Sequence, residues 1–214
     1  MSDSLEVLKQ VIPGFAISLS RFSIATYDAF TSVLMSDIDN IVEDMQRHKN
    51  QHPEDKSENQ LTEHILACLR MLGYQAERDT DFGGHCDLCV QKSEFMWLGE
   101  AKKHGDYQYL ADGFHQLCTR YSNSSPTASL GGLLIYIHQS KGAGVVKEWK
   151  ERLNKQELKG LETYDGLLIE DASKHSSCFY SRHLHHGSGL NYRVRHIPIF
   201  LHHKPMDKSA RNSK

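Results

Sequence analysis

The sequence predicts an α/β fold in which a central mixed β-sheet is flanked by helices, with an N-terminal helical segment and a C-terminal β-hairpin. Three observations predict this fold. Apolar residues recur every three or four positions in several segments, as in amphipathic helices. Residues 131–137 (GGLLIYI) form a nearly continuous apolar run, typical of a strand covered on both faces. Short runs rich in aromatic and β-branched residues, bounded by glycines, predict the other strands.

The first elements in the chain are expected to be helical. Residues 27–47 carry apolar side chains at spacings of three and four, which predicts a long helix. The polar stretch 48–59, with its single proline, is typical of a linker. A second helix starts near residue 58 or 59 and ends at Gly73, a residue suited to a left-handed C-cap. We therefore treat residues 1–57 as an N-terminal helical segment and linker.

The central part, residues 58–171, alternates between strands and helices. Residues 74–78 are expected to be extended, and the glycine pair in DFGGH marks a turn into a strand over 85–90. Residues 94–102 predict the second strand of that hairpin. A helix over 106–121, the strand 131–137, a charged helix over 143–155 and a short strand over 166–169 follow. Residues 172–214 predict a hairpin, with strands 177–185 and 192–201, and a basic tail packed on the core.

Composition excludes several classes of protein. The chain has 214 residues with a formal net charge of −2, which argues against a uniformly basic nucleic-acid coat protein. A hydrophobic fraction of 39% excludes wholesale disorder. Broken apolar stretches and an acidic start predict neither a membrane span nor a cleaved signal peptide. Five cysteines without framework spacing favour a reducing compartment, so we expect a cytoplasmic protein.

The small net charge conceals a gradient along the chain. Residues 1–63 hold 11 acids and 5 bases, residues 64–171 hold 15 and 12, and residues 172–214 hold 1 and 8. The last segment also contains seven of the 14 histidines. We expect this cationic segment to bind a polyanion. Its hairpin carries cations with interleaved tyrosines, which predicts nucleic-acid contacts by Arg182, His183, His185, Arg193 and Arg195.

The residues that carry chemistry lie on the two strands of the first hairpin. Glu100 and Lys102 are two positions apart, so both side chains leave the same face of a strand. If Asp87 pairs beside Glu100, two carboxylates and an ammonium converge. Close carboxylates repel unless a hard cation lies between them, which predicts Mg²⁺ or Mn²⁺ held by Asp87 and Glu100. Metal-assisted phosphodiester hydrolysis follows, with Lys102 activating water and offsetting charge. Glu63 on the preceding helix is a further candidate carboxylate.

These residues resemble the PD-(D/E)xK nuclease superfamily over roughly residues 58–137. Glu63 matches the helix glutamate of that family, Asp87 its strand aspartate, and Glu100 with Lys102 its ExK pair. Gly84 fits the turn that precedes the aspartate, whereas Cys86 stands where the family name has proline.

The helix that follows departs from the family pattern. Some exonuclease-like branches have a glutamine and a tyrosine four positions apart, whereas Gln116 and Tyr121 are five apart. We therefore carry over Gln116 as a residue lining the site and leave Tyr121 out.

The resemblance implies a restriction-endonuclease-like core and a Mg²⁺-dependent deoxyribonuclease. It also implies a place in bacterial DNA processing or anti-phage defence, with an ATPase or helicase partner that supplies specificity. A second copy of the chain is another possible partner for the N-terminal helix. The alternative function is a catalytically silent nucleic-acid-binding or assembly module of the same fold.

Two other interpretations concern the same residues. The tripeptide ExK occurs four times in the chain, but only Glu100 and Lys102 lie in a strand pattern behind an aspartate strand. Cys86 and Cys89 form a CxxC pair that would suit zinc. We expect buried free thiols instead, because no second pair has zinc-site spacing and the two side chains of a regular strand would point to opposite faces.

Overall fold

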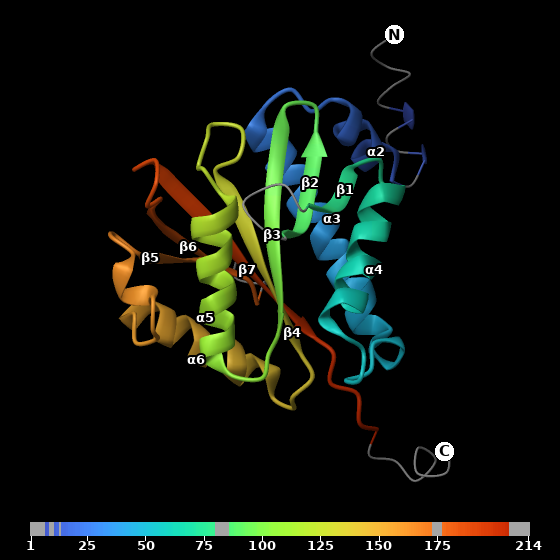
Figure 1. The fold of residues 1–214 in the computed structure, drawn as a ribbon. Coiled ribbons are helices and arrows are strands. Elements are labelled where there is room, and N and C mark those ends of the chain that lie inside the picture. Colours follow the sequence, from blue (N-terminus) through green and yellow to red (C-terminus); the bar gives the residue numbers. More distant parts are fainter. Residues whose placement is uncertain (1–6, 9–10, 13, 80–85, 173–176, 206–214) are drawn as a thin grey trace.

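The computed structural model describes residues 7–8, 11–12, 14–79, 86–172 and 177–205. Seven strands form one sheet in the order β1-β2-β3-β4-β7-β6-β5 (Figure 1). The strands are β1 (Gln75–Asp79), β2 (Cys86–Lys92), β3 (Phe95–Lys103), β4 (Leu130–Ile137), β5 (Leu168–Asp171), β6 (Phe179–Leu184) and β7 (Asn191–Phe200). The helical elements are α2 (Phe15–Phe22), α3 (Tyr27–Arg47), η1 (Lys49–Gln51), α4 (Glu58–Met71), α5 (Tyr107–Gln116), η2 (Leu117–Tyr121), α6 (Gly142–Lys155) and η3 (Leu161–Thr163).

The sheet is mixed, as the sequence predicts. Its centre is parallel, because β3 pairs with β4 and β4 with β7 in the same direction. Both margins are antiparallel, with β1 and β2 beside β3 on one side and β6 and β5 beside β7 on the other. The apolar run 131–137 forms most of β4, which lies between β3 and β7 in the sheet. Its side chains pack into the cores on both faces, as expected.

Each face of the sheet is covered by helices. One apolar core joins α3 and α4 to the sheet residues Trp97, Ala101 and Leu134. The second core joins α5 and α6 to Leu98, Leu133 and Val194 on the opposite face. Figure 1 shows α3 and α4 on one side of the strands and α5 on the other. The alternation of side chains along β3 therefore assigns Glu100 and Lys102 to the α5 face.

The C-terminal hairpin is an integral part of the sheet. β6 and β7 pair antiparallel as predicted, and β7 also pairs with β4 over its whole length. Residues of α3, from the N-terminal segment, share a core with β3, β4 and β7. The boundaries expected at residues 57 and 171 therefore do not separate independent cores.

Local sequence signals explain how α4 begins and ends. Ser57 caps its N-terminus in a capping box with Gln60, and both reciprocal hydrogen bonds are present. The chain leaves the helix through Gly73, which has the predicted left-handed conformation with φ +86°.

Within the described ranges, no helix combines the length and apolar character needed to cross a membrane.

Candidate active site

Glu100 and Lys102 form a buried ion pair on β3. The Lys102 Nζ atom lies 2.5 Å from Glu100 Oε1, and the two residues are 2% and 6% exposed. Both side chains leave the α5 face because they are two positions apart on one strand, as the sequence predicts. The other Glu100 oxygen, Oε2, is buried and has no hydrogen-bond partner among the described residues. This carboxylate thus has an acceptor that the protein itself leaves unused.

Asp87 reaches the same place from a β-bulge in β2. The β1–β2 register shifts between Glu77 and Asp79, so β2 contains one more residue than its partner at this point. Bulges bend a strand and re-aim its side chains, often beside active sites. Asp87 Oδ2 accepts a hydrogen bond from the backbone N–H of Ala101 at 3.1 Å, and Arg78 donates to Oδ1 at 3.2 Å. The predicted convergence of Asp87 with Glu100 and Lys102 is therefore present.

The bulge also changes the position of the two neighbouring cysteines. We expected Cys86 and Cys89 to point to opposite faces, but both pack in the core beneath α5 and α6. They are free thiols, as predicted. Throughout the described part of the chain, no three His, Cys, Asp or Glu side chains are grouped so that they could hold a metal ion. Nothing in this arrangement therefore favours a zinc site at the CxxC pair.

The helix carboxylate nearest to the cluster is Glu58, and not Glu63. Glu63 is exposed and pairs with Arg70. Glu58 lies on the buried stripe of α4 that continues through Thr62, and its Oε2 accepts the backbone N–H of Lys103 at 2.6 Å. The two glutamates are five residues apart, which turns them about 140° from one another around the helix axis. The expectation for Glu63 is corrected accordingly.

Helix α5 covers Lys102 from the solvent side. The Tyr109 ring lies 5.1 Å from Lys102 Nζ, and the Tyr109 hydroxyl donates to Glu58 Oε1 at 3.3 Å. One turn later, Gly113 lets the helix approach closely, because a Cβ there would lie 2.6 Å from Lys102 Cε. Gln116 follows seven positions after Tyr109, on the same face of the helix. Its predicted place lining the site agrees with this face, although its side chain makes no hydrogen bond to another described residue.

The chain reaches Tyr121, which its spacing left outside the predicted site, through an irregular helical turn. Residues Leu117–Tyr121 form a π-helical turn, closed by the Ser122 N–H donating to Leu117 O at 3.3 Å. A π turn accommodates one extra residue in a helix and is often found at functional sites. Tyr121 is buried, and burial followed by the charge of Glu100 raises the pKa of its hydroxyl.

The cluster carries excess negative charge that its surroundings do not neutralise. Burial, followed by the charge of Asp87, raises the pKa of Glu100 to about 7, and Lys102 offsets this only in part. Burial also raises the pKa of Glu58, with Asp87 adding to the effect. Burial lowers the pKa of Lys102, but the charges of Glu100 and Glu58 outweigh burial and raise it. Lys102 is therefore held as an ammonium between carboxylates.

The residues present fit a hard divalent cation with few protein ligands. Asp87 and Glu100 supply carboxylate oxygens, and Glu100 Oε2 is a buried oxygen without a partner. Mg²⁺ usually keeps several waters and takes one or two carboxylates together with substrate phosphates. Arg78, which donates to Asp87, would have to share that carboxylate with the cation. Arg78, Glu58 and Tyr109 were not among the predicted site residues.

The histidines predicted to bind nucleic acid are buried. His183 is 1% and His185 is 7% exposed. His185 Nε2 donates to Ser122 O at 3.0 Å, and the Ser188 N–H donates to its Nδ1. Both are therefore structural in this fold, which corrects the expectation that they contact a substrate.

The three arginines of the hairpin lie on the opposite side of the sheet from Lys102. Aligned residues of neighbouring strands point to the same face of a sheet. Arg195 aligns through Gly132 with Gly99. Glu100, the next residue along β3, points with Lys102 to the other face. Arg195 is 4% exposed and forms two hydrogen bonds with Asp39, at 2.8 and 2.9 Å, so it too is structural. Arg182 and Arg193 are partly exposed and pair with Glu170. They do not extend the carboxylate cluster.

Comparison with known proteins adds no relative to this geometry. No protein-family model, curated protein or solved structure matches the chain. The site must therefore be judged from its own residues.

Proposed function

We propose that the protein is a metal-dependent nuclease that hydrolyses phosphodiester bonds, with DNA as the favoured substrate and Mg²⁺ or Mn²⁺ as cofactor. We further propose that its sheet and the helices around it form a restriction-endonuclease-like core of the PD-(D/E)xK type. The observation that carries the proposal is the buried Glu100–Lys102 pair on one strand with Asp87 aimed at it from a bulge. Ordinary surface hairpins have no reason to bury a glutamate and a lysine together beside a second, partly buried carboxylate.

The chemistry follows from the groups in place. A cation held by Asp87 and Glu100 would polarise the phosphate and supply a water of lowered pKa. Lys102 lies against that carboxylate as an ammonium, so it can orient the attacking water and offset charge on the pentavalent phosphorus. Tyr109 and Gly113 fix the direction of the lysine stem. Glu58 maintains the positive charge of Lys102 from the other side.

The cellular role is proposed on the resemblance in the sequence. We propose that an ATPase or helicase partner, or a second copy, supplies specificity. Bacterial DNA processing and anti-phage defence are the settings in which such nucleases occur. The alternative is a catalytically silent nucleic-acid-binding or assembly module, in which the pairs Lys102–Glu100 and Arg78–Asp87 only stabilise the fold.

The test is cleavage of duplex DNA, single-stranded DNA and RNA by wild type and Lys102→Ala, with Mg²⁺ and then EDTA. Lys155→Ala, on the exposed face of α6, removes a lysine far from the cluster and is the matched control. We expect wild type and the control to cleave at least one substrate with Mg²⁺ only, and Lys102→Ala to be inactive. Absence of cleavage by wild type, alone or with its partner, would support the silent module. Cleavage by Lys102→Ala would place the active site elsewhere.

A further inference from the structure

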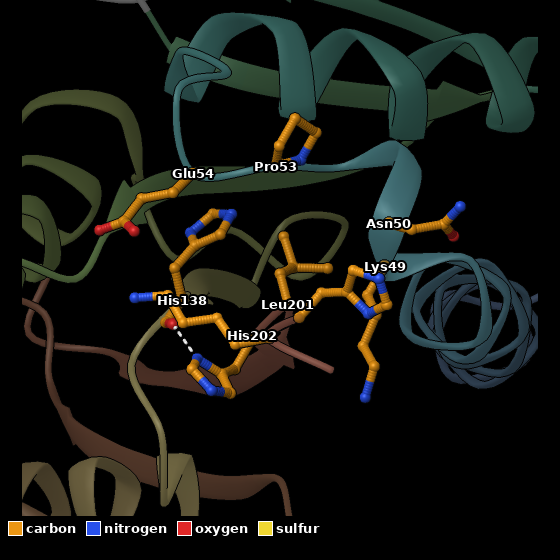
Figure 2. A pocket seen from close by; sticks show the side chains of 9 residues that line it. Lys49, Asn50, Pro53, Glu54, His138, Leu201 and His202 are labelled. Atoms are coloured by element: carbon orange, nitrogen blue, oxygen red, sulfur yellow. Dashed lines mark hydrogen bonds between the residues drawn. The ribbon is translucent and has the colours of Figure 1, made fainter. Parts of the chain in front are cut away.

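A small cavity lies where β4 and β7 end, beside the connection between α3 and α4 (Figure 2). Its volume is about 120 Å³. The lining comes from η1 and the residues after it, from His138 just after β4, and from the residues that follow β7. Segments far apart in the sequence therefore enclose one space at the carboxyl edge of the sheet.

The lining is rich in cationic and imidazole side chains. Five of its nine residues are of this kind, and Glu54 is the single acid among them. The five are Lys49, His138, His202, His203 and Lys204. Neither lysine forms an ion pair with a residue in the described part of the chain. The two lysines outweigh the one glutamate, so the lining has a net positive charge, which favours an anion.

His138 provides a buried polar group without a partner. It is 7% exposed, and its Nε2 donates to the backbone oxygen of His52 at 3.1 Å. Its Nδ1 is buried and lacks a hydrogen-bond partner among the described residues. His202 is held beside it, because its Nδ1 donates to His138 O at 2.8 Å, as Figure 2 shows. Because Nε2 carries the proton of the neutral ring, Nδ1 is an acceptor without a partner, and it becomes a donor when the ring is protonated. A bound anion favours that protonated form.

The cavity and the carboxylate cluster lie toward the same end of the sheet, the cavity on the face of α3 and α4 and the cluster on the face of α5. Lys103, the last residue of β3, donates from its backbone N–H to Glu58 and from its Nζ to the backbone oxygens of Glu54 and Lys56. The short segment from Glu54 to Glu58, at the start of α4, therefore lies beside both the cavity and the carboxylate cluster. In Figure 1 the carboxyl ends of β3, β4 and β7 lie together near the start of α4. Ligands of α/β sheets bind outside the carboxyl ends of parallel strands.

The size of the cavity limits what it can hold. A buried water needs about 10–15 Å³ of such space, so the cavity has room for several waters. Drug-sized and nucleotide-sized ligands need several hundred Å³. A single tetrahedral oxyanion fits this space, whereas a whole nucleotide does not.

We propose that this cavity is a phosphate subsite, which binds one phosphate group of the substrate strand. Its role in substrate binding rests on the nuclease function proposed above, whereas its affinity for phosphate does not. Lys49 and Lys204 supply the charge, His203 supplies an N–H donor, and His138 and His202 donate in their protonated forms. The phosphate can be a strand terminus, an internal phosphodiester or free inorganic phosphate.

The first experiment measures phosphate binding without any cleavage. Protein labelled with ¹⁵N-histidine is titrated with inorganic phosphate, and the histidine resonances are followed by NMR. We expect saturable shifts in wild type, with affinity at least tenfold weaker in Lys49→Ala/Lys204→Ala. The control Lys147→Ala/Lys155→Ala removes the same charge from the exposed face of α6 and should bind like wild type. No saturable shift in wild type, or equal affinity in the two double variants, would overturn the subsite.

The second experiment separates the sources of the phosphate. Affinities of wild type and Lys49→Ala/Lys204→Ala are compared, in EDTA, for one oligonucleotide carrying a 5′-phosphate, a 3′-phosphate or hydroxyls at both ends. A preference for one phosphorylated end that disappears in the variant supports a terminal phosphate. Equal weakening for all three, with a salt slope lower by about one, supports an internal phosphodiester. Unchanged affinity for all three would overturn the substrate role. Intact phosphate binding without cleavage would overturn the nuclease function alone.

Discussion

Glu58 is the residue whose position changes the expected site most. It lies at the first position of α4, where Ser57 caps the helix, and it contacts both the end of β3 and Tyr109. The start of this helix near residue 58 could be predicted from the sequence. The convergence of Asp87, Glu100 and Lys102 could be predicted as well. The choice between Glu58 and Glu63 could not, because it depends on which side of the helix packs against β3.

The two glutamates of α4 make a matched pair of variants. We expect Glu58→Gln to lower Mg²⁺-dependent kcat/KM about 10- to 100-fold. Side chains that support the residues of a metal site commonly contribute this much to activity, and the Glu58 carboxylate helps to keep Lys102 charged. Glu63→Gln, which only loses an exposed pair with Arg70, should retain wild-type activity. Steady-state kinetics on the preferred substrate measures both. Equal losses in the two variants, or a loss confined to Glu63→Gln, would refute the assignment.

At the scale of elements, two irregularities position the site. The bulge in β2 places Asp87 against the backbone of β3, and a π turn follows α5 and ends at Tyr121. The strands and the helix were predictable from their apolar spacing, since periodicity identifies regular elements. One inserted residue shifts the phase of all that follows, and the prediction that Cys86 and Cys89 point to opposite faces was wrong for this reason.

Contact between α5 and β3 depends on the absence of a side chain at Gly113. In Gly113→Ala the new Cβ would collide with Lys102 Cε and Cγ, at 2.6 and 2.7 Å. We expect the lysine to be displaced and activity to fall about 10²-fold, as a misplacement near 1 Å can cost this much. Stability should change little, because alanine favours the helix by about 1 kcal/mol over glycine. Kinetics and thermal unfolding measure the two effects. Wild-type activity in this variant would show that Lys102 needs no fixed position.

At the scale of the whole molecule, charge is distributed differently from what the sequence suggested. The cationic C-terminal segment was expected to face nucleic acid, but Arg195 pairs inside the structure and three of its histidines are buried. A sequence count cannot tell a buried neutral imidazole from an exposed one. The mixed sheet and its flanking helices were predictable, whereas the insertion of β7 beside β4 was not, because strand order depends on long-range pairing.

The buried histidines make stability depend on pH. Burial lowers the pKa of His196 to about 3 and of His183 to about 4, from an ordinary value of about 6.5. The unfolded chain therefore binds more protons below pH 6.5, and the free energy of unfolding falls as the pH decreases from there. Each fully buried histidine contributes about 1–2 kcal/mol of this loss between pH 6.5 and 5.

Urea unfolding at pH 7.5 and pH 5 measures this dependence. His183 lies among the rings of Phe114, Tyr164 and Tyr192, and neither of its nitrogens has a hydrogen-bond partner in the described ranges. A phenylalanine suits this environment, so His183→Phe should lose about 1–2 kcal/mol less than wild type at pH 5. An identical loss in wild type and variant would show that His183 does not titrate on unfolding.

The Mg²⁺ dependence of cleavage in Asp87→Asn and Glu100→Gln tests the central claim most directly. We predict that wild type cleaves nucleic acid in Mg²⁺ and stops in EDTA, and that each variant loses about 10³-fold or more while keeping the wild-type fold by circular dichroism. Glu63→Gln serves as the carboxylate control and should stay active. Cleavage that persists in EDTA, or wild-type rates in Asp87→Asn and Glu100→Gln, would contradict a metal-dependent site at these two carboxylates.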